Sequence, residues 1–233
     1  MHLGSSLSVV DVLDAIYRRI EARGETTSPS PLVLSKGHAV WALYALLAEQ
    51  GCRRYDDVAG LPGHPSDDSP GIDVATGALG HGLSVAAGMA EGFRLSGTER
   101  AVYVILGDGE LNEGSVWEAV TFAAHRSLDR LVVVVDVNGL QQEGATDDVL
   151  RMTPLAPRWE AFGWDVVSVD GHDDAALDEA LARAEASTVP AVVLARTVKG
   201  KGVSFMEGAL EWHTGQLDAR HFDLASADLG PEA

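Results

Sequence analysis

Two polar residues, Asp108 and Asn138, each follow an apolar run and stand 30 positions apart (138 − 108). The runs, residues 101–106 and 131–135, show no polar alternation, which is typical of strands buried on both faces of a parallel sheet. Residues 115–125, between the runs, have the length of a crossover helix. Asp108 and Asn138 are therefore predicted at the carboxyl ends of two parallel strands, where open α/β sheets bind ligands. Their hard oxygens suit Mg²⁺ or Ca²⁺ holding a diphosphate.

A plainer interpretation is that these motifs are only turns. Glycines flank the aspartate, and Asn138-Gly139 after an apolar run is a strong hairpin signal. A hairpin needs a returning strand of alternating apolar residues, and residues 140–144 (Leu-Gln-Gln-Glu-Gly) do not provide one. Two strand-end motifs joined by one helix-length segment favour the site at the sheet edge, where Gly107 and Gly109 would let the backbone approach a diphosphate closely.

Composition excludes several classes of protein. The 233 residues carry a formal net charge of −18, which argues against nucleic acid or an anionic membrane as a partner and is typical of a solubilising surface. Cys52 is the only cysteine, so no intrachain disulfide can form and a cytoplasmic location is expected. The sequence shows no signal peptide and no run of about 18 apolar residues.

The remaining pattern predicts one doubly wound α/β domain over residues 1–233, with a mostly parallel sheet and helices on both faces. Residues 53–77 contain three prolines and no periodicity, which indicates a long ordered loop of the kind that is usually functional. Leu13, Ile16 and Ile20 would form the buried face of a helix. Helices are predicted over residues 9–22, 39–50, 83–95 and 174–186, further strands over 164–169 and 191–195, and an irregular acidic tail over 208–233.

Together, Gly107-Asp108-Gly109 and Asn138 resemble the thiamine-diphosphate motif, and the continuation to Trp117-Glu118-Ala119 is similar to the amino-terminal half of a transketolase. The similarity is greatest to two-subunit transketolases, in which the two halves are separate chains. It extends almost from end to end and implies a thiamine-diphosphate-binding fold of the diphosphate type. Seven segments carry it in family order: residues 2–8, 34–39, 63–65, 76–82, 107–119, 199–207 and 211–213.

The resemblance implies a set of cofactor ligands. Asp108, Asn138 and the backbone carbonyl of Leu140 would bind Mg²⁺ (or Ca²⁺), with two diphosphate oxygens and a water completing the coordination. The glycine-rich turn at residues 77–82 would lie along thiamine diphosphate; since no apolar strand precedes it, a dinucleotide-binding loop is disfavoured. The implied cofactor contacts are His38, Gly77, Leu79, Gly107, Asp108, Gly109, Glu110, Asn138, Leu140 and His213.

Four of the eight histidines, His2, His38, His64 and His213, fall within the matched segments. By resemblance they line the reaction side of the cofactor, bind donor hydroxyls and move protons. Imidazole, with an ordinary pKa of ~6.5, can both remove a hydroxyl proton and return one to a carbanion near neutral pH. The spacing of the histidines shows no zinc-binding pattern.

Three charged residues admit two interpretations each. Glu113, five positions after Asp108 (113 − 108), could stabilise the first turn of the crossover helix or, by resemblance, belong to a catalytic carboxylate network at a subunit contact. Lys199 and Lys201 could steer an anionic ligand or merely punctuate a mobile loop. The resemblance favours a loop that closes over the cofactor.

The resemblance also implies what a second chain must supply. In transketolases the glutamate that activates thiamine diphosphate, and the sugar-phosphate-binding arginines, lie on the pyrimidine-domain half, and no second α/β domain is predicted here. The chain is therefore expected to be inactive until it joins a C-terminal subunit in an α₂β₂ assembly. A ketose donor would give a two-carbon unit to an aldose phosphate or, in specialised metabolism such as antibiotic biosynthesis, to a lipoyl group on a carrier protein.

Two other classes stay open. The alpha subunit of a 2-oxo acid dehydrogenase shares the cofactor, but its motif lacks the continuation to Ala119; a non-catalytic scaffold would not need the intact motif residues. Two positions depart from the family pattern. Met1 stands where relatives have a glycine before His2, which indicates an upstream start or a trimmed paralogue. His81 replaces the usual glutamine and could alter diphosphate or acceptor contacts.

Overall fold

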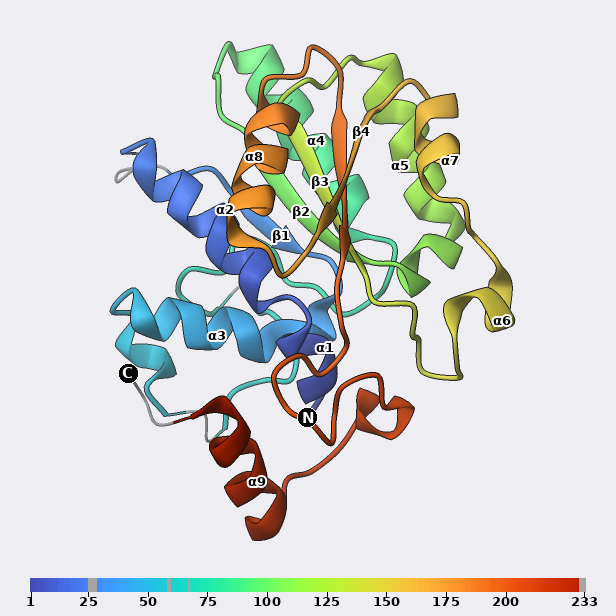
Figure 1. The fold of residues 1–233 in the computed structure, drawn as a ribbon. Helices are drawn as coiled ribbons and strands as arrows, with labels where there is room; N and C mark the ends of the chain where they lie inside the picture. The colour runs from blue at the N-terminus through green and yellow to red at the C-terminus, as the bar shows by residue number, and fades with distance from the viewer. Residues whose placement is uncertain (25–28, 58–59, 67, 231–233) are drawn as a thin grey trace.

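The computed structural model describes residues 1–24, 29–57, 60–66 and 68–230. All five strands are parallel and form one sheet in the order β1-β2-β3-β5-β4 (Figure 1). The predicted α/β class with a parallel sheet is confirmed. The strands are β1 (Leu32–Leu34), β2 (Val102–Gly107), β3 (Leu131–Val137), β4 (Asp165–Asp170) and β5 (Ala191–Arg196).

Strands β2 and β3 are almost entirely apolar because both faces of the sheet are covered; the charged exception is Asp136, near the end of β3. In β3, Val132 and Val134 pack into the core on one face, whereas Val133 and Val135 pack into the core on the other. Each of the four is 0% exposed. Continuous apolar runs are the expected pattern for strands buried on both sides, so the two predicted strands are confirmed.

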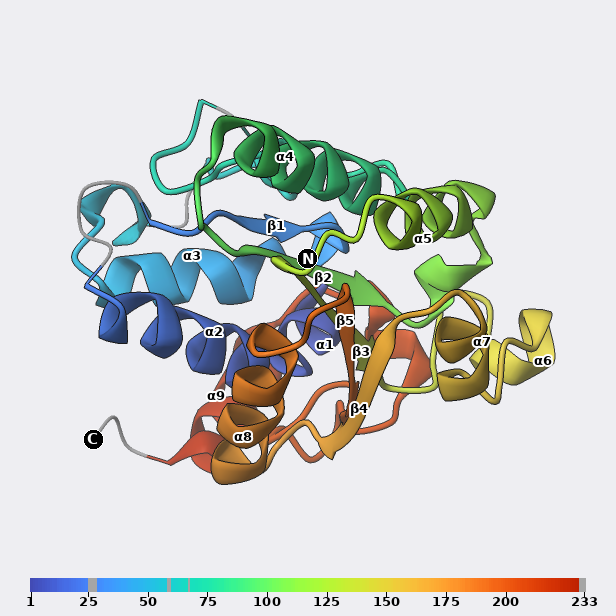
Figure 2. The same cartoon turned by 90° about the horizontal axis from the view of Figure 1, so that it is seen from above.

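Helices lie on both faces of the sheet, as Figure 2 shows from above. One face is covered by α2 (Val10–Ala22), α3 (Val40–Glu49) and α8 (Asp174–Glu185), and the other by α4 (Gly82–Ser96), α5 (Gly114–His125) and α7 (Ala156–Ala161). Leu13, Ile16 and Ile20 form the buried face of α2, as predicted. The connection from β2 through α5 to the adjacent β3 is the predicted crossover.

Four short helices and strands escaped prediction. They are α1 (Leu3–Leu7), β1, α6 (Thr146–Leu150) and α7. Strand β1 has only three residues, too few for a periodic signal, and it forms because β2 lies beside it with Leu32 opposite Tyr103. The predicted long loop holds one 3₁₀ turn, Arg53–Tyr55, and residues 58, 59 and 67 of it lie outside the described part.

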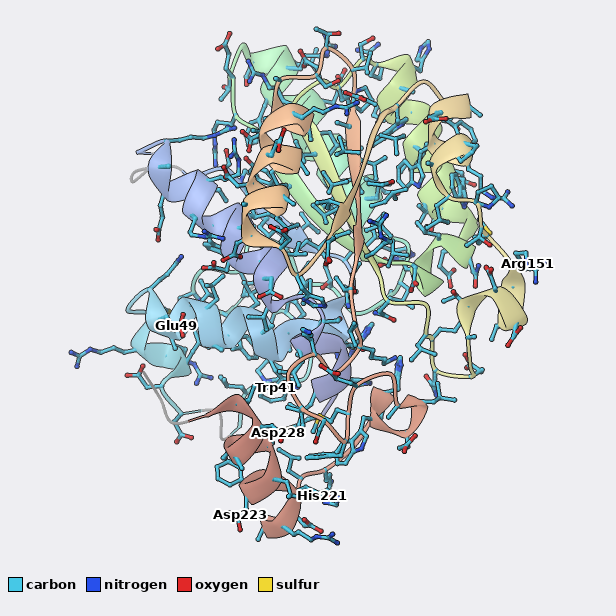
Figure 3. All side chains as sticks on the ribbon, viewed as in Figure 1. Trp41, Glu49, Arg151, His221, Asp223 and Asp228 are labelled. Carbon is cyan, nitrogen blue, oxygen red and sulfur yellow. The ribbon has the colours of Figure 1, made fainter. Side chains whose placement is uncertain are left out.

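The prediction of an irregular tail is wrong. Residues Leu210–His213 form a 3₁₀ turn and Ala219–Leu229 form α9. Asp218 caps α9 by accepting the His221 N–H at 2.8 Å, and Ala225 packs against Val203 and Met206. Only this one α9 side chain is buried among the described residues, which explains the weak apolar signal. Helix α9, with His221, Asp223 and Asp228 upon it, extends away from the sheet layers (Figure 3).

The beginning of the chain packs beside the segment that follows β5. Within this contact, Gly200 N–H donates to the Gly4 carbonyl of α1 (Leu3–Leu7) at 2.9 Å, and Gly215 N–H donates to the Met1 carbonyl at 3.0 Å. Residues far apart in sequence, such as His2 and His213, are thereby brought together. Across the described ranges, no helix combines the length and apolar character needed to cross a membrane.

Candidate active site

One cavity of about 370 Å³ opens at the carboxyl ends of β2 and β3. Every site residue predicted from the sequence lines it, although the roles of these residues stay predictions. They are His2, His38, His64, Gly77, Leu79, Gly107, Asp108, Gly109, Glu110, Glu113, Asn138, Leu140 and His213.

Asp108 is the centre of the sheet-edge site. It follows β2 directly, is 6% exposed, and accepts the Gly139 N–H at 2.6 Å and the Gly109 N–H at 2.8 Å. Burial, together with the nearby charge of Asp136, raises the pKa of Asp108 to about 6. A carboxylate held in place by backbone donors but short of compensating positive charge is suited to binding a cation.

Asn138 and Leu140 lie opposite Asp108 in the turn after β3. The Asn138 side-chain oxygen accepts the Leu140 N–H at 3.1 Å, and its amide nitrogen donates to Asp136 at 3.2 Å. A φ of +75° at Gly139 allows the tight turn that places its N–H on Asp108. This turn continues into one isolated antiparallel bridge, Leu140 to Ala145, and not into a hairpin strand.

Glycines keep the cavity walls close to the backbone. A Cβ atom at Gly109 would lie 2.9 Å from the Gln141 Cβ, and one at Gly77 would lie 3.3 Å from the His64 ring. Gly77 also has a φ of +154°, which side-chain-bearing residues rarely adopt. The glycine types at these positions are therefore required by close packing around the cavity.

The two glutamates differ in their surroundings. Glu110 is 2% exposed, and its carboxylate accepts from the Ser35 hydroxyl at 2.5 Å, from Gly80 N–H at 2.8 Å and from Gly107 N–H at 3.2 Å, so it joins three loops around the cavity. Burial raises the pKa of Glu110. Glu113 was predicted in the first turn of the crossover helix, but it is the residue before α5 and makes no capping hydrogen bond with its side chain.

A buried ion pair, of which Lys36 lines the cavity, was not predicted. Lys36 is 1% exposed and contacts Asp136, which is 0% exposed and also accepts from the hydroxyls of Ser8, at 2.7 Å, and Thr197. Burial alone would raise the pKa of Asp136, but the Lys36 charge and these donors lower it. An aspartate within the apolar strand β3 was the signal in the sequence, because a buried carboxylate needs a partner.

Lys199 is a buried group, which contradicts the view that it only punctuates a mobile loop. It is 1% exposed, its Nζ lies 2.6 Å from His213 Nδ1, and it approaches the Leu140 carbonyl at 3.5 Å. Burial and the nearby Lys36 charge lower the pKa of Lys199 to about 8. Lys201, in contrast, is half-exposed and lies 3.9 Å from Glu207.

The four predicted histidines gather on one side of the cavity. The His2 ring centroid lies 5.2 Å from that of His38, 5.6 Å from that of His213 and 6.3 Å from that of His64. Burial, followed by nearby positive charge, lowers the pKa of His38 to about 2 and that of His213 to about 4, and lowers that of His2. His38 and His213 are therefore neutral at pH 7. Since Lys199 donates to His213 Nδ1, the ring proton of His213 lies on Nε2.

His81 does not line this cavity. It precedes α4, is exposed, and borders a neighbouring hollow of about 200 Å³ that shares Gly77 with the main cavity. His81 thus lies at the rim beside Gly77 and not in the wall around Asp108, and its effect on diphosphate or acceptor contacts stays a prediction.

The residues present fit a diphosphate held by a divalent cation. Asp108, Asn138 and Leu140 offer one carboxylate, one amide and one carbonyl oxygen at the same sheet edge. In the described part of the chain no three His, Cys, Asp or Glu side chains are placed to hold a metal; the predicted donor set contains only one such side chain, Asp108. The glycine-lined walls leave room for an anionic group beside these oxygens.

Known proteins are similar to this chain in sequence and in fold. The family described as transketolase, thiamine diphosphate binding domain, matches residues 1–233. The chain is 40% identical to one subunit of the apulose-4-phosphate transketolase of Actinobacillus succinogenes, over 99% of this chain and 88% of that protein. It is 40% identical to 6-deoxy-6-sulfo-D-fructose transketolase subunit SqwG of a Clostridium species, over 99% and 89%. The transketolase structure from Campylobacter jejuni superposes with a TM-score of 0.79 at 30% identity, over 86% of this chain but only 34% of that one.

Proposed function

Because this chain belongs to the transketolase family, as its thiamine-diphosphate-binding domain, we propose that it is the diphosphate-binding subunit of a split transketolase. It would take part in transferring a two-carbon ketol unit from a ketose donor to an aldose phosphate. The observation that carries the proposal is the single cavity that all the predicted site residues line at the ends of β2 and β3.

We assign the diphosphate end of the cofactor to the sheet edge. Asp108, Asn138 Oδ1 and the Leu140 carbonyl would hold Mg²⁺, whose charge would offset that of the diphosphate. Lys199 adds a positive charge beside the Leu140 carbonyl, where an anion would be stabilised. When bound, thiamine diphosphate supplies the electron sink that permits cleavage of the bond between the second and third carbons of a ketose.

The histidine side of the cavity would bind the sugar and manage its protons. Neutral His38 and His213 each offer one donor and one acceptor, which suits them to orienting hydroxyl groups. The ring centroids of His2 and His64 lie 6.3 Å apart on the same side of the cavity. We assign these two residues to proton exchange with the donor hydroxyl. Glu113, whose side chain caps no helix, is free to join a carboxylate contact with a partner chain.

A partner subunit supplies the rest of the enzyme in this proposal. Relatives that this chain matches over 88–89% of their own length are named as subunits, whereas it spans 34% of a solved transketolase chain. We place the pyrimidine domain on a separate C-terminal subunit, in an α₂β₂ assembly of the cytoplasm, with residues 1–233 as one domain. The sugars in the names of these two relatives carry a phosphate or a sulfo group. The donor proposed for this chain is therefore a ketose with an anionic end.

The test is a titration of the two-chain complex with thiamine diphosphate and Mg²⁺, followed by addition of a ketose phosphate. The variant Asp108→Ala removes the proposed metal ligand. The matched control is Asp174→Ala, which removes a carboxylate that is 69% exposed on α8 and does not line the cavity. Metal-dependent binding should be lost in Asp108→Ala alone, and donor cleavage should require both chains.

Three results would contradict the proposal in different ways. Turnover of ketose donors by this chain alone would remove the need for a partner. Cofactor binding without donor cleavage would favour 2-oxo acid chemistry, and absence of cofactor binding in the complex would favour a scaffold role. With cleavage established, parallel assays with an aldose phosphate and with a lipoyl carrier protein identify the acceptor.

A further inference from the structure

His172, which follows β4, joins three separate segments of the chain. Its Nδ1 lies 2.6 Å from the carboxylate of Asp11 in the first turn of α2, and its Nε2 accepts the Val198 N–H at 2.8 Å. Since the Val198 amide can only donate, Nε2 carries a lone pair and the ring proton lies on Nδ1, donated to Asp11. The side chain is 12% exposed, and one acceptor and one donor fix the orientation of its ring.

The Val198 amide is the link between His172 and the active site. On one side of it, Thr197 is fixed to β3, because its N–H donates to the Val137 carbonyl at 3.1 Å and its hydroxyl donates to Asp136. On the other side is Lys199, whose ammonium reaches His213. The backbone at Val198 therefore sets the direction in which the Lys199 side chain leaves the sheet.

The segment that carries His172 is itself packed closely on the end of β5. Gly171 N–H donates to the Arg196 carbonyl at 2.7 Å, and a Cβ atom at Gly171 would lie 2.5 Å from Thr197 Cγ2. The His172 N–H donates to Asp170 at 3.0 Å, which fixes the turn after β4. The imidazole is thus presented to Val198 from an anchored backbone.

We propose that His172 is a positioning residue of the active site: by accepting the Val198 N–H, it holds the backbone from which Lys199 reaches His213 and the Leu140 carbonyl. His172 does not line the cavity, so it acts only through Val198. Asp11 contributes by keeping the ring proton on Nδ1, which leaves Nε2 free to accept.

Two substitutions at the same position separate positioning from simple packing. In His172→Gln the amide oxygen reaches the place of Nε2 and can still accept the Val198 N–H. In His172→Asn the shorter amide reaches only the place of Nδ1, so the contact with Asp11 persists and the contact with Val198 is lost. Both variants keep a polar, uncharged side chain of similar character.

Lysine labelling reports on the consequence, because the chain has only three lysines. Lys36 and Lys199 are each 1% exposed, whereas the Lys201 side chain is 46% exposed. An amine-reactive reagent, followed by mass spectrometry of peptides, should label Lys201 rapidly and Lys36 slowly in all three proteins. Lys199 should react slowly in wild type and His172→Gln, and about fivefold faster in His172→Asn, which corresponds to losing a hydrogen bond worth about 1 kcal/mol.

The proposal is overturned if Lys199 is labelled as slowly in His172→Asn as in wild type, or if it is labelled as fast in His172→Gln as in His172→Asn. An equal increase in the labelling rate of Lys36 would also overturn it, since that would show that the whole fold had become more accessible. Nitrogen NMR of the wild-type His172 ring needs no variant: a bare Nε2 supports the proposal, and a protonated Nε2 refutes it. Labelling requires neither cofactor nor partner, so its outcome is independent of the transketolase assignment.

Discussion

Replacement of Lys36 by methionine is expected to destabilise the chain by about 3–5 kcal/mol at neutral pH. The Lys36 ammonium contacts the Asp136 carboxylate, and neither residue is more than 1% exposed. Methionine fills much of the lysine volume, so little cavity cost is added. Asp136 would keep only neutral donors, the hydroxyls of Ser8 and Thr197 and the amide of Asn138, against a full buried charge.

A second variant tests whether charge, and not shape, causes the loss. Asp136→Asn in the Lys36→Met background removes the unpaired charge while keeping an oxygen that can accept from the hydroxyl of Ser8. The double variant should lose only about 1–2 kcal/mol, because the remaining cost is that of imperfect hydrogen bonding. Urea unfolding of wild type, both single variants and the double variant gives the coupling energy directly.

The pH dependence of the destabilisation by Lys36→Met provides an independent test. Without Lys36, burial should hold the pKa of Asp136 above its ordinary value of ~3.9, so the folded state binds a proton more tightly than the unfolded state. The cost of Lys36→Met should therefore be larger at pH 8 than at pH 5. A single variant within about 1 kcal/mol of wild type, or one as unstable as the double variant at both pH values, would refute the reasoning.

Three further changes have defined outcomes. Gly80→Ala should lower the free energy of unfolding by at least about 2 kcal/mol, since Gly80 has a φ of +81° and a Cβ there would lie 2.5 Å from the Ser115 hydroxyl. Gly88→Ala, in open space on α4, should raise it by ~0.5–1 kcal/mol, and thermal unfolding compares the two variants. When the pH is lowered from 7.5 to 5.5, the free energy of unfolding of wild type should fall by ~1.4 kcal/mol more than that of His38→Gln. Burial lowers the pKa of His38 to about 2, so the imidazole stays neutral in the folded state, whereas in the unfolded state, with a pKa of ~6.5, it takes up a proton over this range. Equal decreases in urea unfolding would disprove this. Glu110→Gln should lower the free energy of unfolding by about 1–3 kcal/mol, since the new NH₂ group would face one of the donors of Ser35, Gly80 and Gly107. An unchanged midpoint of urea unfolding would show that these three hydrogen bonds do not contribute to stability.

The sequence by itself determined strands β2 to β5 and the place of the metal-site candidates. Apolar runs without alternation mark β2 and β3 because both faces of these strands are buried, and the one buried carboxylate, Asp136 of β3, is paired with Lys36. A helix-length connection between them makes the strands parallel, which puts Asp108 and Asn138 at the same edge. Family motifs named the other predicted site residues, all of which line the cavity.

Local pattern was insufficient where an element depends on distant contacts. Strand β1 exists because β2 pairs with it, and α9 buries a single side chain against residues some twenty positions earlier (225 − 203 = 22; 225 − 206 = 19). Neither has enough buried apolar surface of its own to leave a periodic signal. The irregular tail was therefore predicted where the structure has a helix.

Only the tertiary structure decided how the charged groups around the cavity are paired. Lys36 and Asp136 are 100 positions apart, and His172 and Val198 are 26 apart. Lys199 and His213 are joined by a segment without a periodic pattern. Each side chain can be identified from the sequence as polar, but its partner is set by where loops leave the sheet. That placement also fixes burial, and burial is what shifts the pKa values of Asp108, His38 and Lys199.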